Sequence, residues 1–178
     1  LELAFQSTLG PAVVATQGYA SPDTGQVYSR SRELCKLVGE AEDIYPVLFG
    51  VYLFELGRAR HERALDLAEE LLERAQQSQD SAARAAGHLT MAVSLIHMGK
   101  QTIAHQHCQK ALDLHDPDQH RPIAFRYGLE IGTAVNAYCA WTLWLLGYPD
   151  QALEHGLQSL DFLERIKHPY TESRALYW

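Results

Sequence analysis

The sequence predicts an all-α protein built as a stack of antiparallel helical hairpins. Four segments end an apolar helical pattern at a glycine and then begin an amphipathic helical pattern. These turns recur at spacings of 39, 42 and 48 residues, and such self-similarity is typical of helical repeat arrays. Alternation of apolar and polar residues does not persist over the length of a strand anywhere in the chain. The four turn glycines are Gly18, Gly57, Gly99 and Gly147.

Each predicted hairpin combines a turn glycine with a second helix that carries an apolar stripe. Glycine suits the turn because the residue after a helix C-terminus often takes a left-handed conformation that costs other residues energy. Apolar residues at i, i+4 and i+7 or i+8 place one face of each second helix against its neighbours. Small residues recur on that face, where we expect paired helices to cross. They are Ala64, Ala104 and Ala152, followed by Ala68, Cys108 and Gly156.

We predict a single helical-repeat domain over residues 1–178, with about four hairpins and the start of a fifth. The chain begins at Leu1 without a methionine and ends inside a helical pattern, so we expect it to be a piece of a larger protein. Because a solenoid needs a polar cap at each end, the truncated C-terminal helix predicts self-association. The predicted hairpins span about 1–39, 42–78, 80–116 and 129–166, and the partial helix spans 169–178.

The connection from His115 to Gly128 is the one long irregular segment, with two prolines and mixed charge. A loop of this length in a compact array is often functional or mobile. An insertion into a solenoid also disturbs little, because only neighbouring repeats touch. The sequence leaves both interpretations open.

Composition excludes several classes of function. The chain has 15 basic and 22 acidic side chains and a formal charge of −7, which argues against a nucleic-acid surface. The most apolar stretch, Ala134 to Tyr148, is too short to span a bilayer, so we expect no membrane partner. Cys35, Cys108 and Cys139 lie far apart in apolar helical stretches, which favours reduced core thiols in a cytoplasmic protein.

Two segments resemble the tetratricopeptide repeat. In "MGKQTIAHQHCQKALDLHDP", Gly99 is followed by Ala104 and Ala111, and Pro117 closes the helix. In the segment "LGYPDQALEHGLQSL", Gly147 and Ala152 match the glycine and the first alanine, and Ser159 stands in place of the second alanine. The resemblance implies a superhelical stack. The second hairpin departs from the pattern because Gly57 lies seven residues before its alanine, so we predict two extra residues in that turn.

A second resemblance covers nearly the whole chain. Segments such as "HDPDQHRPIAFRYG" and "AWTLWLLGYPDQALE" resemble the helical-repeat region of large bacterial signalling proteins. In that family the region follows a predicted nucleotide-hydrolysing switch domain, which is often joined to a cyclase, a protein kinase or a DNA-binding domain. The resemblance implies a regulatory setting. The ATPase and output domains are not part of this sequence.

No enzymatic signature is complete. The chain lacks a phosphate-binding loop and a nucleophile elbow, and the His61-Glu62 pair lacks a second histidine one turn later. His105 and Cys108 are one turn apart but give only two ligands of a zinc site. The dipeptide His115-Asp116 resembles those of all-helical metal phosphohydrolases, which need further ligands on other helices. We therefore predict no catalytic residue, no cofactor and no metal.

The resemblance to tetratricopeptide arrays implies that the first helix of each hairpin lines a concave groove. An apolar groove of this kind suits an amphipathic helix or an extended peptide. The alternative is that these residues pack between hairpins as core, which is favoured for Trp141 and equally weighted for Phe54 and Trp144. The candidate groove residues are Val51, Phe54, Leu89, Val93, Ile96, Trp141 and Trp144.

These observations favour a non-catalytic protein–protein interaction or scaffolding module in a multidomain bacterial signalling protein. Its partner would be a protein, a peptide or another domain of the same chain. The alternative is a domain that senses a small-molecule effector near Trp141, Trp144 and residues 115–128 and controls a linked ATPase, cyclase or transcription-regulating domain. A metal phosphohydrolase is the third hypothesis.

Overall fold

The computed structural model describes residues 2–38, 44–120 and 124–166, and it confirms the all-α prediction. Every regular element in these ranges is a helix, and they contain no strand. No helix in the described ranges is long and apolar enough to cross a membrane. The eight long helices are α1 (Glu2–Gln17), α2 (Pro22–Val38), α3 (Ile44–Gly57), α4 (His61–Gln76), α5 (Ser81–His97), α6 (Gln101–Leu114), α9 (Ile131–Leu146) and α10 (Pro149–Ile166).

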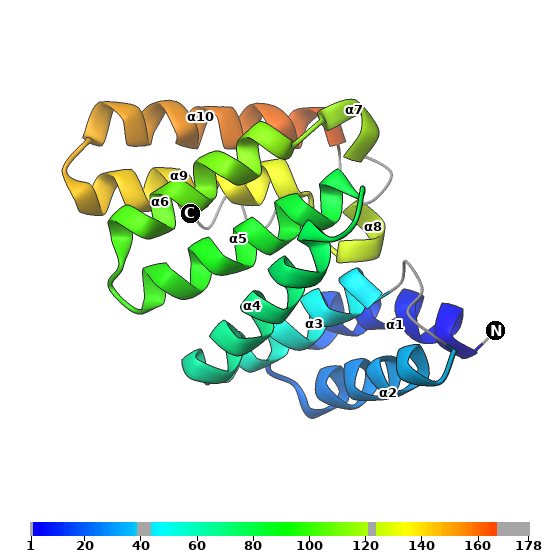
Figure 1. The fold of residues 1–178 in the computed structure, drawn as a ribbon. Coiled ribbons are helices and arrows are strands. Elements are labelled where there is room, and N and C mark those ends of the chain that lie inside the picture. Colours follow the sequence, from blue (N-terminus) through cyan, green and yellow to red (C-terminus); the bar gives the residue numbers. More distant parts are fainter. Residues whose placement is uncertain (1, 39–43, 121–123, 167–178) are drawn as a thin grey trace.

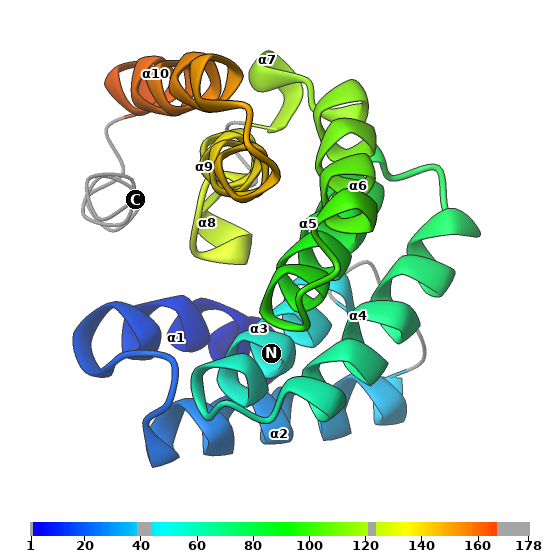
Figure 2. The same cartoon turned by 90° about the vertical axis from the view of Figure 1, so that its left-hand side faces the viewer.

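Consecutive long helices pair into four hairpins, which stack in chain order from α1 and α2 to α9 and α10 (Figures 1 and 2). Within the stack, α5 packs against α4 and α6, and α9 packs against α5, α6 and α10. The predicted stack of hairpins is therefore confirmed. The partial fifth hairpin, predicted at 169–178, lies outside the described residues, as does the self-association assigned to it.

The connection predicted as irregular contains two single-turn helices, α7 (Pro117–His120) and α8 (Ala124–Tyr127). Tyr127, the last residue of α8, and Leu129 are only 4% and 5% exposed and belong to the main hydrophobic core. The Tyr127 ring meets Phe49 of α3 edge-on, with 5.3 Å between ring centroids. The segment thus packs between the second and fourth hairpins as part of the fold.

Three of the four turn glycines take the left-handed conformation, with φ of 84° at Gly18, 75° at Gly99 and 88° at Gly147. The expectation for Gly57 is wrong. Helix α3 continues through Gly57, and Ala59 takes the left-handed conformation instead, with φ of 56°. At Gly57 space is tight rather than the backbone unusual, because a Cβ there would lie 3.1 Å from Cβ of Tyr19.

Small residues let neighbouring helices approach closely at the core. The predicted crossing positions Ala64, Ala68, Ala104 and Cys108 are fully buried. Gly87 of α5 adds a crossing that the pattern did not indicate, because a Cβ there would lie 2.9 Å from the Cα of Leu72 in α4. By contrast, a Cβ at Gly156 of α10 would meet no atom within 4 Å. The crossing position of the fourth hairpin is therefore open.

This contrast predicts opposite effects for two matched substitutions. Gly87→Ala should lower the free energy of unfolding by about 1–3 kcal/mol, because the added methyl group meets the backbone of α4. Gly156→Ala should raise it by about 0.5–1 kcal/mol, because alanine is the better helix former and the space is free. Urea unfolding followed by circular dichroism measures both, and a change of the same sign in the two variants would contradict the packing described.

Candidate functional site

The fourth hairpin leaves large apolar side chains exposed to solvent. Trp144 of α9 is 66% exposed, and Leu153 and Leu157 of α10 are 65% and 58% exposed. They surround a hollow of about 650 Å³ between the two helices. We call it the α9–α10 hollow. Its lining comprises Ala137, Ala140, Trp141 and Trp144 on α9 and Pro149, Ala152, Leu153, Gly156, Leu157, Ser159 and Leu160 on α10.

The α9–α10 hollow corresponds to a site that is filled on the preceding hairpin. The turn glycines Gly99 and Gly147 align the two hairpins with an offset of 48 residues. Seven lining positions then correspond to residues of α5 and α6 that are at most 5% exposed, and α9 packs against these two helices. The seven counterparts are Leu89, Ala92, Val93, Ile96, Ala104, Cys108 and Ala111. The hollow on the fourth hairpin thus corresponds to the surface of the third hairpin on which α9 packs.

The lining of the hollow is almost entirely apolar. Its one hydroxyl, on Ser159, donates to the backbone oxygen of Thr133 at 3.0 Å and is already satisfied. Next to the lining, α10 carries three exposed acidic residues on one stripe, Asp150, Glu154 and Asp161. A molecule bound in the hollow would therefore contact an apolar floor that is bordered on one side by acidic residues.

The seven candidate groove residues do not form one surface. Leu89, Val93 and Ile96 are 3–5% exposed beneath α9 and offer a partner almost no area. Val51 and Phe54 are half-buried on α3. The Phe54 ring occupies the space above Gly25, where a Cβ would lie 2.6 Å from it. These residues therefore pack between the hairpins.

Trp141 and Trp144 are the two candidate residues that meet in the hollow. The Trp141 ring lies edge-on to His97, with 5.9 Å between centroids, and alongside Tyr138 at 6.1 Å. It is half-buried, whereas Trp144 projects into solvent.

The leucines of α10 belong to the site but not to the predicted groove. Leu153 and Leu157 fitted the apolar stripe of a second helix and were expected to pack against neighbours. One signal distinguishes them: the corresponding positions of the third hairpin, 48 residues earlier, are polar, His105 and Gln109. The apolar face of α10 is therefore wider than the apolar face of α6, the corresponding helix of the third hairpin.

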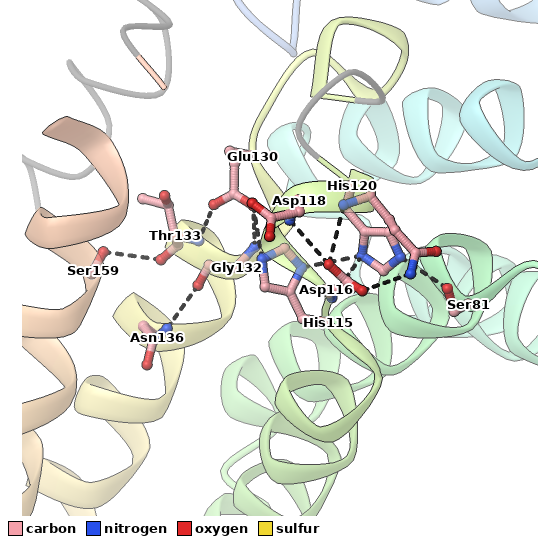
Figure 3. A network of polar contacts seen from close by, with 11 residues as sticks. Ser81, His115, Asp116, Asp118, His120, Glu130, Gly132, Thr133, Asn136 and Ser159 are labelled. Atoms are coloured by element: carbon pink, nitrogen blue, oxygen red, sulfur yellow. Dashed lines mark hydrogen bonds and ion pairs between the residues drawn. The ribbon is translucent and has the colours of Figure 1, made fainter. Parts of the chain in front are cut away.

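A second feature is a buried polar junction between the third and fourth hairpins, shown in Figure 3. The Glu130 carboxylate caps α9 by accepting hydrogen bonds from the backbone N–H groups of Gly132, at 2.9 Å, and Thr133. His115 Nε2 lies 3.1 Å from Glu130 Oε1, and the two side chains are 2% and 1% exposed. Gly132 is required here because a Cβ would lie 2.3 Å from His115 Nε2.

The junction continues from His115 to the start of α5. The Asp116 N–H donates to His120 Nδ1 at 3.3 Å, so this nitrogen is an acceptor. His115 Nδ1 lies 3.2 Å away and must therefore donate to it, and His120 Nε2–H donates to Ser81 Oγ at 2.9 Å. Burial lowers the pKa of His120 below its ordinary value, which favours this neutral form. The start of α9 is thus tied to the start of α5.

The junction holds its groups in place but gives a substrate no access. Of the metal-ligand candidates in the sequence, His115 and Asp116 lie within the junction, while His105 Nδ1 lies 4.0 Å from Cys139 Sγ. In the ranges that the structure describes, no three His, Cys, Asp or Glu side chains are grouped closely enough to hold a metal ion. Cys35, Cys108 and Cys139 are buried and form no disulfide with one another, as predicted.

The junction predicts acid-sensitive stability that depends on Glu130. Burial raises the pKa of Glu130, but hydrogen bonds from His115 and Thr133 outweigh this effect and hold it below the ordinary 4.5. A carboxyl group with a lowered pKa stabilises the fold above pH 4.5, and the contribution is lost as the pH falls through the folded-state pKa. Glu130→Gln should therefore cost about 1–3 kcal/mol of stability at pH 7 and progressively less on acidification.

Thermal unfolding of both forms at several pH values between about 7 and 3 measures this difference. Glu154→Gln, on the exposed side of α10, is the matched control and should leave the pH profile nearly unchanged. A constant difference between wild type and Glu130→Gln over the whole range would refute an ionised, paired Glu130.

Comparison with known proteins gives no independent assignment. No protein-family model matches the chain, and no curated protein sequence matches it. The function therefore has to be argued from the geometry of the α9–α10 hollow and of the polar junction.

Proposed function

We propose that this chain is a non-catalytic protein-interaction or scaffolding module of a multidomain bacterial signalling protein, and that the α9–α10 hollow receives a helix. One observation carries the proposal. Seven of the eleven positions that line the hollow correspond to positions of the third hairpin that are at most 5% exposed, on the two helices against which α9 packs. Within the part of the chain that the structure describes, the corresponding surface of the fourth hairpin remains open.

The chemistry of the hollow specifies the kind of helix. Gly156 leaves room for close approach, so a small residue is expected where the bound helix crosses α10. Trp144, Leu153 and Leu157 supply apolar contact area, which favours apolar residues at i, i+3 or i+4 and i+7 of the partner. The acidic stripe on α10 favours basic residues along one edge of that helix.

A small-molecule effector is the second candidate. The volume of about 650 Å³ falls within the usual range for ligand pockets. Such pockets normally contain a few unengaged polar groups that orient the ligand, whereas the Ser159 hydroxyl is already hydrogen-bonded. No described residue of 115–128 lines the hollow. These facts favour a helix over a small polar ligand.

The resemblance to bacterial signalling proteins supplies the setting of the proposal. The hollow would bind a helix of a partner, or of another domain of the same protein, only in the conformational state that exposes this helix. Binding would therefore favour that state, because a ligand shifts an equilibrium by its difference in affinity for the two states. The proposal requires no chemistry within this chain.

Selection from a library of displayed helical peptides as long as α9, 16 residues, tests the proposal. We expect enrichment of amphipathic helices with a central small residue. Binding of a selected labelled peptide should weaken at least about tenfold in Leu157→Glu, because the new carboxylate lies on the apolar floor.

Ile103→Glu is the matched control, since Ile103 is 48% exposed on α6 and does not line the hollow. It should leave peptide binding unchanged. A library that yields no binder, or binders that are equally affected by the two substitutions, would argue against the hollow as a helix-binding site.

A further inference from the structure

Helices α5 and α6 of the third hairpin, which run side by side (Figures 1 and 2), are joined by two histidines. Nδ1 of His88 on α5 lies 3.0 Å from Nδ1 of His107 on α6, and the ring centroids are 5.1 Å apart. Both side chains are half-buried. We call them the His–His pair. A hydrogen bond between the two nitrogens requires that one Nδ1 carries a proton and that the other carries none.

The fourth hairpin has a different pair at the corresponding positions. With the offset of 48 residues, His88 corresponds to Asn136 of α9, and His107 corresponds to His155 of α10. His155 Nδ1 lies 2.9 Å from Asn136 Oδ1, so the imidazole donates a hydrogen bond to the amide oxygen. This bond persists when the His155 ring carries protons on both nitrogens. The His–His pair differs, because protons on both Nδ1 atoms leave its hydrogen bond without an acceptor.

The charges that act on the two pairs also differ. Lys110 of α6 acts as a positive charge on both members of the His–His pair, whereas Glu154 of α10 acts as a negative charge on His155. At each of these places the other hairpin has a neutral glutamine, Gln158 or Gln106. A nearby cation opposes protonation of an imidazole and a nearby anion favours it. The third hairpin is therefore the one that resists protonation more strongly.

The remaining charged groups around the His–His pair belong to α3, α4 and α5. Arg84 lies one turn before the histidine of α5. Helix α4, which contacts α5 at Leu72, carries the exposed Glu69 and Glu73. Glu55, the one charged residue of α3, pairs at 3.0 Å with the arginine that precedes α4, and α9 has no charged residue. The two carboxylates of α4 thus belong to the α4 side of α5, whereas the histidine of α5 faces α6.

Protonation of the His–His pair in the folded protein is therefore unfavourable. Burial, followed by His107 and Lys110, lowers the pKa of His88 from 6.5 to about 4. The pKa of His107 is also lowered, first by burial and then by Lys110. Between about pH 6.5 and 4 the unfolded chain consequently binds more protons than the folded chain. The stability that the neutral pair contributes is fully present above pH 6.5 and is lost as the pH falls through this window.

We propose that the His–His pair is a pH switch: in mild acid both histidines become protonated, α6 separates from α5, and the third hairpin opens while the first stays closed. Residues 1–60 contain no histidine, so the first hairpin has no such contact. Leu89 and Cys108, which follow the two histidines in the sequence, are buried where α9 packs. Opening therefore also loosens the surface that supports the fourth hairpin. The pair lies outside the α9–α10 hollow, so the switch does not depend on the proposed function.

Thiol labelling at about pH 5 and about pH 7.5 tests the switch, because a buried cysteine is exposed only when its surroundings open. Cys108 lies beside the His–His pair, and Cys35 lies on α2 of the first hairpin, so the chain contains its own reference. The reagent is dithiodipyridine, a disulfide that reacts with thiols at both pH values. Mass spectrometry of peptides identifies the labelled cysteine. The principal variant is His88→Asn, which gives the third hairpin the His–Asn pair of the fourth.

At the lower pH, Cys108 should be labelled roughly tenfold faster in wild type than in His88→Asn, because the variant pair keeps its hydrogen bond when protonated. Comparing the same cysteine at the same pH removes differences in thiol reactivity. At the higher pH the two proteins should not differ, and Cys35 should be labelled equally in both at either pH. Equal rates for Cys108 in acid would overturn the switch. A change at Cys35 as large as that at Cys108 would also overturn it, since the whole chain would then be opening.

His107→Asn tests whether the two histidines act as a pair. It should also slow the labelling of Cys108 in acid, and the double substitution should slow it by less than the product of the two single effects. Single effects that multiply would mean that the histidines titrate independently, and would overturn the switch. His61→Asn, on α4, is the matched control and should leave the labelling of Cys108 at the wild-type rate. If circular dichroism at about pH 7.5 shows that His88→Asn has lost helix content, His107→Asn takes its place in the comparison with wild type.

Discussion

The arrangement of this chain depends on a packing constraint: a helical hairpin has two faces and needs a neighbour to cover each apolar one. The third hairpin meets this constraint on its C-terminal side, because α9 buries Ala104, Cys108 and Ala111 completely. The fourth hairpin repeats much of this pattern of small and apolar residues, and no element in the described ranges fills the α9–α10 hollow. The same difference is seen at two glycines. A Cβ at Gly87 would lie 2.9 Å from the backbone of α4, whereas a Cβ at Gly156 would meet no atom within 4 Å.

The longer connection after α6 has a polar role that complements this packing. It places His115 against Glu130, whose carboxylate caps the first backbone N–H groups of α9 inside the protein. A buried carboxylate is costly unless it is paired and hydrogen-bonded, and Glu130 meets both conditions. The insertion therefore fixes the start of α9 relative to the start of α5. The position of α9 relative to α5 in turn determines how the fourth hairpin, which forms the hollow, packs on the third.

The period of glycines and apolar stripes was sufficient to predict the helices, the hairpins and most crossing points. It could not predict Gly57 correctly, because a helix that continues two residues further moves the left-handed position to Ala59. It could not separate covered from open positions either. Leu89 and Trp144 lie on equivalent first helices, and among the described residues a following helix, α9, packs over Leu89 only. The polar junction was also beyond prediction, because irregular backbone brings His115 to Glu130.

The polar junction and the α9–α10 hollow differ in the chemical groups that they expose. Catalysis needs acid–base groups that a substrate can reach. The buried set His115, His120 and Glu130 is engaged in capping and in linking helices, and His115 and Glu130 are at most 2% exposed at their side chains. The accessible hollow has the opposite character, with large apolar area and one hydroxyl that is already bonded. The proton-transfer groups of the junction are thus withheld from solvent, whereas the hollow offers a partner mainly apolar contact area. Such a surface is suited to a helix.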